Sequence, residues 1–148
     1  MDQNNNSIHD FDFSLICNYF SSLERQGPGS DEATLTALHF AESIQPGAKV
    51  ADLGSGTGSS ALLIARQTQA HVIAVDAFAD FLTKLEHNAT RLGLDSLIEP
   101  IVGDMAHLSF ERESLDAIWS EGAIYNIGYE HGLRYWHQFL RPGGFVAV

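Results

Sequence analysis

Apolar residues recur along the chain with two different periods, and the first of them is helical. Over residues 8–23 the apolar positions that follow this spacing are Phe11, Leu15, Ile16, Tyr19, Phe20 and Leu23. They predict an amphipathic helix, which the segment Gln26-Gly27-Pro28-Gly29 ends. Ser30 can cap a second helix, with Ala37, Leu38, Ala41 and Ile44 on its buried face, before Pro46-Gly47 stops it. The chain is therefore expected to begin with helices.

Beyond Gly47 short apolar runs alternate with helical patterns. The expected strands are 49–53, 71–75, 97–102, 117–120 and the start of another at 145–148. The expected helices between them are 59–67, 78–92 and 129–140. Strands joined by helical crossovers form a parallel sheet with helices on both faces, and ligands bind such sheets at the carboxyl ends of the strands. The pattern therefore predicts an α/β domain of three layers.

Composition limits the class of protein. A length of 148 residues fits one domain. No apolar run approaches the roughly 20 residues that span a bilayer, and the start of the chain lacks the basic and apolar regions of a secretory signal. The single cysteine, Cys17, excludes an internal disulfide and favours a reducing compartment, so we expect a cytoplasmic protein.

Charge limits the class of partner. The formal net charge is −11, from 19 acidic and 8 basic residues, and it would repel a phosphate backbone. Nucleic acid is therefore not an expected partner, whereas a cationic ligand suits the field. The seven histidines are scattered without the spacing of metal ligands, so no metal site is expected.

The sharpest chemical signal is a glycine loop between a strand and a helix. Three alternate glycines, Gly54, Gly56 and Gly58, follow the strand 49–53 directly. Glycine permits a sharp turn and lets a ligand lie against the backbone where a Cβ would not fit. The alternative is a tight turn that binds no ligand.

Two acidic positions follow the next two strands. Asp76 comes near the spacing of about 20 residues at which an acid binds ribose hydroxyls in nucleotide-binding folds. Its alternative role is to cap the helix that follows. Asp104 and Met105 could hydrogen-bond an adenine edge, but Gly-Asp is also an ordinary turn. Each of these acidic positions follows a successive strand, and this order favours a role in ligand binding.

Together these motifs resemble the class I S-adenosylmethionine-dependent methyltransferases. The resemblance is carried by Asp52 to Gly58, Asp76, Asp104 and the run Leu140-Arg141-Pro142-Gly143-Gly144-Phe145, and it extends from about Gln26 to the last residue. It implies a Rossmann-like methyltransferase fold with S-adenosylmethionine as cofactor. The segments 24–30 and 119–128 are similar to an uncharacterised bacterial branch that acts on small molecules.

The resemblance also implies roles for individual residues. The glycine loop would lie beneath the methionine part and the ribose, Asp76 would bind both ribose hydroxyls, and Asp104 with Met105 would contact adenine. The full set of expected cofactor-binding residues is Gln26, Gly29, Ser30, Asp52, Gly54, Gly56, Gly58, Asp76, Ala77, Phe78, Asp104, Met105 and Glu121.

The implied domain organisation has two parts. Residues 1–25 are expected to form a helical lid, and residues 26–148 the S-adenosylmethionine-binding domain. In the family the strand order is 3-2-1-4-5-7-6, yet the last expected strand here is the fifth. We therefore expect a sheet truncated after the fifth strand, so that the chain is a fragment, or a homodimer or other partner chain that pairs with that open edge.

The implied activity is methyl transfer to an unidentified small-molecule acceptor by in-line displacement, which releases S-adenosylhomocysteine. Glu121, Tyr125 and Asn126 follow the fourth strand, so they are candidates to position or deprotonate the acceptor. Their alternative role is that of loop and helix-cap residues.

Two other functions remain open. An NAD-dependent oxidoreductase would carry Gly or Ala at the position of Ser59, and Asp52 would repel its pyrophosphate. A non-catalytic module that binds S-adenosylmethionine is harder to distinguish from an enzyme by sequence. Alignment of two reactants alone can lower a barrier by about 7 to 11 kcal/mol, so methyl transfer needs no obvious base.

Overall fold

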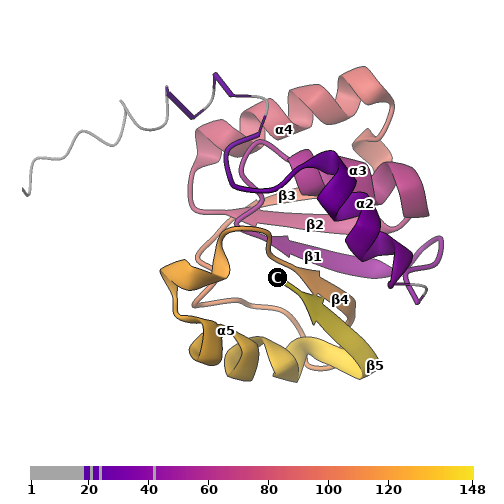
Figure 1. Cartoon of the computed structure of the whole chain (residues 1–148), viewed down its shortest axis with the longest axis vertical. Coiled ribbons are helices and arrows are strands. Elements are labelled where there is room, and N and C mark those ends of the chain that lie inside the picture. Colours follow the sequence, from indigo (N-terminus) through magenta and orange to yellow (C-terminus); the bar gives the residue numbers. More distant parts are fainter. Residues whose placement is uncertain (1–18, 21, 24, 42) are drawn as a thin grey trace, which may run out of the picture.

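The computed structural model describes residues 19–20, 22–23, 25–41 and 43–148. Most of the lid expected over residues 1–25, and of the helix predicted over 8–23, lies outside the described residues. The chain forms a five-stranded parallel sheet in the order β3-β2-β1-β4-β5 (Figure 1). The strands are β1 Lys49–Leu53, β2 His71–Asp76, β3 Ile98–Val102, β4 Leu115–Trp119 and β5 Leu140–Ala147. The predicted α/β class and the predicted parallel sheet are therefore confirmed.

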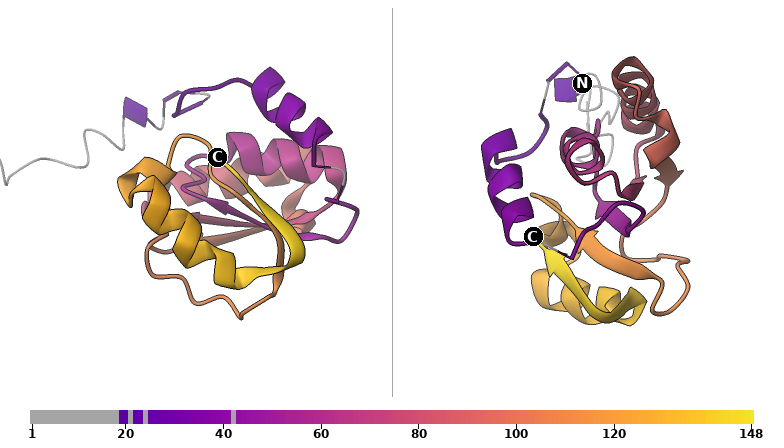
Figure 2. Two further views of the ribbon diagram at one scale, coloured as in Figure 1. Left: turned by 60° about the horizontal axis from the view of Figure 1, so that its bottom comes forward. Right: turned by 90° about the vertical axis from the view of Figure 1, so that its right-hand side faces the viewer.

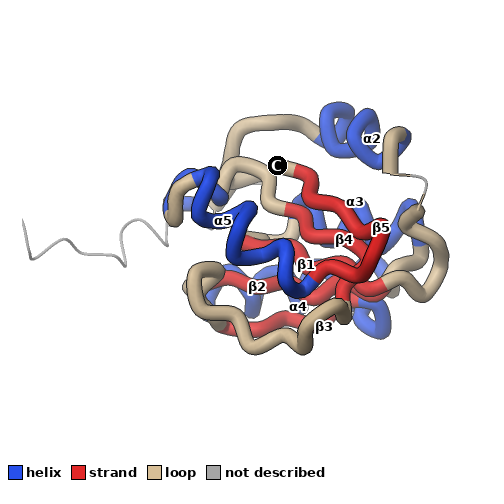
Figure 3. The backbone as a smooth tube through the Cα atoms, turned by 90° about the horizontal axis from the view of Figure 1, so that it is seen from below, coloured by secondary structure: helices blue, strands red, loops and turns tan. Residues whose placement is uncertain are grey.

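Helices cover both faces of the sheet, which lies between them in Figure 2. On one face lie α2 Asp31–His39, α3 Ser59–Thr68 and α4 Ala79–Leu92. The helix α5 Tyr129–Trp136 crosses the opposite face (Figure 3). The described residues also form three 3₁₀ turns: η1 Asp95–Leu97, η2 Ile124–Asn126 and η3 His137–Phe139. Within the described ranges no helix is long and apolar enough to cross a bilayer.

Each face of the sheet has its own apolar core. On the α3 and α4 side the core includes Val50, Ile64, Val72, Ala74, Leu85 and Trp119. On the α5 side it includes Ala51, Leu53, Ile73, Val75, Ile118, Trp136 and Phe139. Because successive residues of a strand point to opposite faces and both faces are covered, the central strands are apolar throughout. These two cores fix the positions of the strand ends from which the functional loops extend.

The N-cap of α2 is the one predicted from the sequence, but the helix ends earlier than predicted. The Ser30 hydroxyl accepts a hydrogen bond from the backbone N–H of Ala33 at 3.1 Å, as expected of an N-cap. The helix ends at His39, before two of the residues predicted on its buried face. Ala41 and Ile44 are nevertheless buried, in the turn that follows.

The last helix and the last strand also begin and end elsewhere than predicted. The helix expected over 129–140 ends at Trp136, and β5 starts at Leu140 rather than at Phe145. Leu140 pairs with Leu115 and Phe145 pairs with Ala117, so the strand between them is irregular. It contains Pro142, which has no N–H to donate, and Gly143, whose φ is +85°. The irregularity explains why an apolar pattern alone did not reveal the first half of β5.

Candidate functional site

A cavity of about 550 Å³ lies at the carboxyl ends of the central strands. Its lining comes from the loops after β1, β2, β3 and β4, and from the segment 25–28 that precedes α2. This is the edge of the sheet at which ligands of parallel α/β folds bind. The topology therefore brings together loops that are far apart in the sequence.

In the glycine loop after β1, Gly54 and Gly56 have no room for a side chain. Gly54 and Gly56 have φ values of +77° and +55°, in the left-handed region that favours glycine. A Cβ on Gly54 would meet the Cβ of Ala123 and would lie 3.0 Å from Met105 Cε, and a Cβ on Gly56 would meet the side-chain oxygen of Gln26. Neighbouring protein atoms thus already require glycine at both positions.

Asp76 at the end of β2 supports this loop. Its Oδ2 accepts a hydrogen bond from the backbone N–H of Gly56 at 2.8 Å, and its Oδ1 accepts one from the N–H of Phe78 at 3.0 Å. Burial raises the pKa of Asp76 above its usual value, although these N–H groups act in the opposite direction. Each oxygen retains acceptor capacity for a ligand hydroxyl.

Asp52 at the end of β1 is a buried acid. It is 2% exposed, and its Oδ2 has no hydrogen-bond partner among the described residues. Burial raises the pKa of Asp52 to about 7, and the charges of Glu121 and Asp76 add to this effect, while the backbone N–H of Ala61 and the charge of Arg25 oppose it. An ionised carboxylate at this depth needs a cation nearby.

Three further buried polar atoms around the cavity lack a hydrogen-bond partner within the described part of the chain. They are Gln26 Nε2, Ser55 Oγ and Arg25 Nη1, although Nη1 lies 3.7 Å from Asp31 Oδ1. Leaving such donors unsatisfied costs about 1 to 3 kcal/mol each. Hydrogen-bond donors and a buried carboxylate thus face one cavity, which suits a ligand that carries both a cationic group and acceptor atoms.

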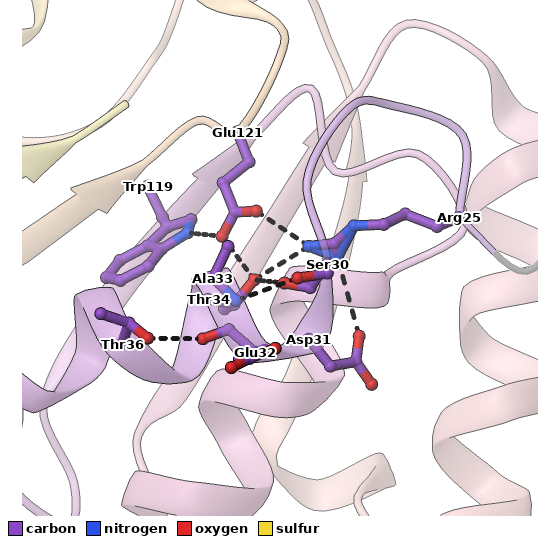
Figure 4. A network of polar contacts seen from close by, with 9 residues as sticks. All are labelled: Arg25, Ser30, Asp31, Glu32, Ala33, Thr34, Thr36, Trp119 and Glu121. Atoms are coloured by element: carbon purple, nitrogen blue, oxygen red, sulfur yellow. Dashed lines mark hydrogen bonds and ion pairs between the residues drawn. The ribbon is translucent and has the colours of Figure 1, made fainter.

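Glu121, just after β4, holds together distant parts of the site (Figure 4). Its Oε1 accepts hydrogen bonds from Thr34 Oγ1 at 2.7 Å and from Trp119 Nε1 at 2.8 Å. Its Oε2 accepts one from Arg25 Nη2 at 2.8 Å, and the same Nη2 donates to Thr34 Oγ1 at 2.9 Å. The carboxylate thereby connects β4 to α2 and to the segment 25–28.

Comparison with known proteins identifies the family. A family model described as a methyltransferase domain matches residues 50–144 of the chain. The chain belongs to this family. This methyltransferase domain is 33% identical over 106 residues to the sterol methyltransferase-like 1 of Botryococcus braunii, a match that covers 71% of the chain and 27% of that protein.

A second relative of the methyltransferase domain is bacterial. The malonyl-[acyl-carrier protein] O-methyltransferase of Dechloromonas aromatica is 31% identical over 134 residues, covering 86% of the chain and 48% of that protein. The chain thus spans about a quarter to a half of the length of these curated relatives.

The fold of the methyltransferase domain also matches solved structures. An SAM-dependent methyltransferase of Geobacter sulfurreducens, crystallised with S-adenosyl-L-homocysteine, superposes with a TM-score of 0.77 at 26% identity. The match covers 90% of this chain and 53% of that one. The Rossmann-like methyltransferase fold that the sequence resemblance implied is therefore confirmed.

Most of the predicted cofactor-binding residues of the methyltransferase domain meet at the cavity. Those that line it are Gln26, Asp52, Gly54, Gly56, Asp76, Ala77, Phe78, Asp104, Met105 and Glu121. The other predicted residues, Gly29, Ser30 and Gly58, are not part of the lining. Ser30 instead caps α2, and Gly58 occupies the N-cap position of α3, where a Cβ would lie 2.7 Å from Leu85 Cδ1. These glycine and serine positions therefore shape the elements around the cavity.

The loop after β3 is held by its own acid and by α5. Asp104 Oδ1 accepts a hydrogen bond from Ala106 N at 2.8 Å, and Oδ2 lies 2.9 Å from His107 Nδ1. The Ala106 N–H and then the imidazole of His107 lower the pKa of Asp104. The Met105 carbonyl accepts a hydrogen bond from Trp136 Nε1 at 2.9 Å. Trp136 is buried, so its indole is a fixed anchor for this loop.

The two remaining candidates for contact with an acceptor lie in η2. Tyr125 and Asn126 both line the cavity, and Tyr125 is 69% exposed. Asn126 Nδ2 donates a hydrogen bond to the Ala123 carbonyl at 2.9 Å, so this side chain also stabilises the local turn. The sequence missed Arg25 and Ser55, which line the cavity as well. Arg25 fell at the end of the predicted lid, although it lies inside the motif 24–30 that supported the resemblance.

Proposed function

We propose that the protein binds S-adenosylmethionine in this cavity and transfers its methyl group to a small-molecule acceptor, releasing S-adenosylhomocysteine. One observation carries the proposal: the buried carboxylate of Asp52 faces the same cavity as the buried donors of Gln26 and Ser55. The charge of the Asp52 carboxylate suits the ammonium and sulfonium of S-adenosylmethionine, and the donors of Gln26 and Ser55 can hydrogen-bond its carboxylate. The methyltransferase relatives support the same chemistry.

The proposed roles follow the position of each residue along the cavity. Asp52 attracts the ammonium group, and Gln26 with Ser55 donates to the carboxylate of the methionine part. Asp76 accepts hydrogen bonds from the ribose hydroxyls with the lone pairs that its backbone partners leave open. Asp104 and Met105, with Ala77 and Phe78, contact the adenine from the loops after β3 and β2. Gly54 and Gly56 let the methionine part approach the backbone.

S-adenosylmethionine supplies an electrophilic methyl group, which a lone pair of the acceptor takes in line while the sulfur–carbon bond breaks. The contribution of the protein is alignment, which can lower a barrier by about 7 to 11 kcal/mol without an acid or base. Tyr125 and Asn126 lie on the β4 side of the cavity, where they position the acceptor. Three donors already surround the Glu121 carboxylate, so Glu121 belongs to the structure of the site.

A small-molecule acceptor and a cytoplasmic location are parts of this proposal. The net charge of −11 disfavours a phosphate backbone as a partner. The single cysteine, Cys17, is typical of a protein from a reducing compartment. A dimer or another chain that pairs with β5 stays a prediction.

Thermal shift and calorimetry with three ligands test the binding step. S-adenosylmethionine and S-adenosylhomocysteine should each raise the Tm, whereas NAD should not, because Asp52 would repel its pyrophosphate. A panel of metabolites, followed by the release of S-adenosylhomocysteine, then tests transfer. A Tm increase with NAD alone would contradict the proposal. Tight binding without turnover on any acceptor would favour the non-catalytic module instead.

A further inference from the structure

We infer that Glu121 is a positioning residue: through Arg25 it holds Gln26 against the glycine loop, and through its charge it tunes Asp52 as the receptor for the cationic end of the cofactor. The inference rests on the proposed function and deepens it. It gives Glu121 a role that acts through two other residues and needs no contact with the acceptor.

The first step is the fixed position of the Glu121 carboxylate. Two of its donors, Thr34 and Trp119, belong to residues that are 0% exposed, so the core of the protein sets their places. The third donor, Arg25, is 17% exposed in its side chain, and Glu121 is 20% exposed. Ion pairs that are shielded from water in this way are screened less by salt than surface pairs. Glu121 is therefore a rigid anchor for the guanidinium of Arg25.

The second step leads from Arg25 to the glycine loop. Gln26 follows Arg25 directly, and its side-chain carbonyl accepts a hydrogen bond from Thr57 N at 2.9 Å. The same amide occupies the space beside Gly56, and its Nε2 is buried at the cavity. A shift of Arg25 away from Glu121 would therefore move the donor that we assign to the methionine carboxylate.

Close packing makes this segment hard to move independently. A Cβ on Gly122, the residue after Glu121, would lie 2.9 Å from Pro28 Cδ. The segment 25–28 is thus held on one side by the loop after β4 and on the other by the loop after β1. Loss of the Arg25–Glu121 ion pair would free the Arg25 guanidinium from the loop after β4, while the packing of Pro28 against Gly122 stays.

The third step is the balance of charge around Asp52. Among the described residues that line the cavity, Arg25 carries the basic side chain, and Asp52, Asp76, Asp104 and Glu121 carry acidic ones. Burial is the main cause that raises the pKa of Asp52, and the carboxylates of Glu121 and then Asp76 add to it. The backbone N–H of Ala61 and then Arg25, which also has Asp31 at 3.7 Å, lower this pKa. Glu121 and Arg25 should therefore shift the ionisation of Asp52 in opposite directions.

Calorimetric titration with S-adenosylhomocysteine between pH 6 and pH 9 tests the inference. In the wild type the affinity should rise with pH as Asp52 ionises, because its carboxylate receives the ammonium group. Glu121→Gln should weaken binding by about tenfold, a loss of about 1.4 kcal/mol, and should move the midpoint of the rise to lower pH. Arg25→Gln should also weaken binding but should move the midpoint to higher pH.

Two further variants separate charge from geometry. Arg25→Lys keeps the positive charge but replaces the guanidinium, whose Nη2 donates to both Thr34 and Glu121, with an ammonium on a shorter side chain. The affinity should therefore fall with little change of the midpoint. Glu130→Gln is the matched control. It removes an equal charge from an Arg134 pair that is 81% and 80% exposed and lies outside the cavity. This control should keep the affinity and the midpoint of the wild type.

The outcomes distinguish the inference from the proposed function. If the wild type binds neither S-adenosylmethionine nor S-adenosylhomocysteine, the proposed function fails. If the wild type binds with a pH-dependent affinity that Glu121→Gln leaves unchanged in strength and midpoint, the positioning role is overturned and the proposed function stands. If Glu121→Gln does not fold, the same titration of Arg25→Gln and Arg25→Lys tests the charge effect from the other side of the ion pair. Equal midpoints in these two variants would overturn that effect.

Discussion

The carboxylate of Asp76 accepts a 2.8 Å hydrogen bond from the backbone N–H of Gly56, which lies 20 residues earlier in the chain. The bond joins the end of β2 to the glycine loop after β1. The Asp76 side chain thus stabilises the conformation of the glycine loop and also lines the cavity. Loss of this carboxylate should therefore affect a ligand both directly and through the loop.

Asp76→Ala should weaken S-adenosylhomocysteine binding by about 10- to 150-fold, because hydrogen bonds to a charged group contribute about 1.5 to 3 kcal/mol. Asp76→Asn should lose less, since its carbonyl can still accept from Gly56 or from Phe78. Calorimetry of both variants measures the difference. Unchanged affinity in Asp76→Ala would restrict Asp76 to its role in the loop.

The buried acid Asp52 predicts a pH dependence of stability. Its pKa is about 7 in the folded protein, against 3.8 as the ordinary value. Between these values the folded state holds a proton that the unfolded chain has lost, so the free energy of unfolding should fall as the pH rises. Urea unfolding of the ligand-free protein should show this fall between pH 5 and pH 7.

Asp52→Asn is the control for that measurement, because the amide does not titrate. Its unfolding free energy should depend less on pH over the same window than that of the wild type. An equally steep dependence in both proteins would mean that other groups cause it. S-adenosylhomocysteine should reduce the dependence in the wild type, because its ammonium group favours the charged form of Asp52.

Gly54→Ala should destabilise the fold more than Gly93→Ala. Both glycines have a positive φ, +77° and +68°, so both substitutions carry a backbone cost of about 1 to 2 kcal/mol. Gly54→Ala also forces its methyl group against Ala123 and Met105, which adds about 1 to 3 kcal/mol, whereas a Cβ on Gly93 would have no atom within 4 Å. Equal midpoints of urea unfolding for the two variants would contradict the packing argument.

Periodicity predicted the elements whose signals are local. Apolar runs predicted the strands at Lys49–Leu53 and His71–Asp76, and helical spacing predicted that α4 ends at Leu92. The start of β5 did not, because Pro142 and Gly143 interrupt its pattern with an irregular pairing. Local signals thus give element type more reliably than element ends.

The candidate site likewise has parts that the sequence predicts and parts that it does not. Its loops could be predicted because each follows a strand, and the resemblance supplied roles for most of them. The contacts of Glu121 could not be predicted, since Arg25 and Thr34 lie 96 and 87 residues away in the sequence. Nor could the pKa of Asp52 be anticipated, because it depends on how deeply the fold buries this side chain.

The side chain of Gln26 occupies the space that a Cβ on Gly56 would need, although the two residues are 30 positions apart. A larger residue at position 56 therefore demands a smaller one at position 26. Substitutions at positions 26 and 56 are therefore selected together, and these two positions should covary among homologous chains. An alignment deep enough to reveal such covariation would record this contact without any structure.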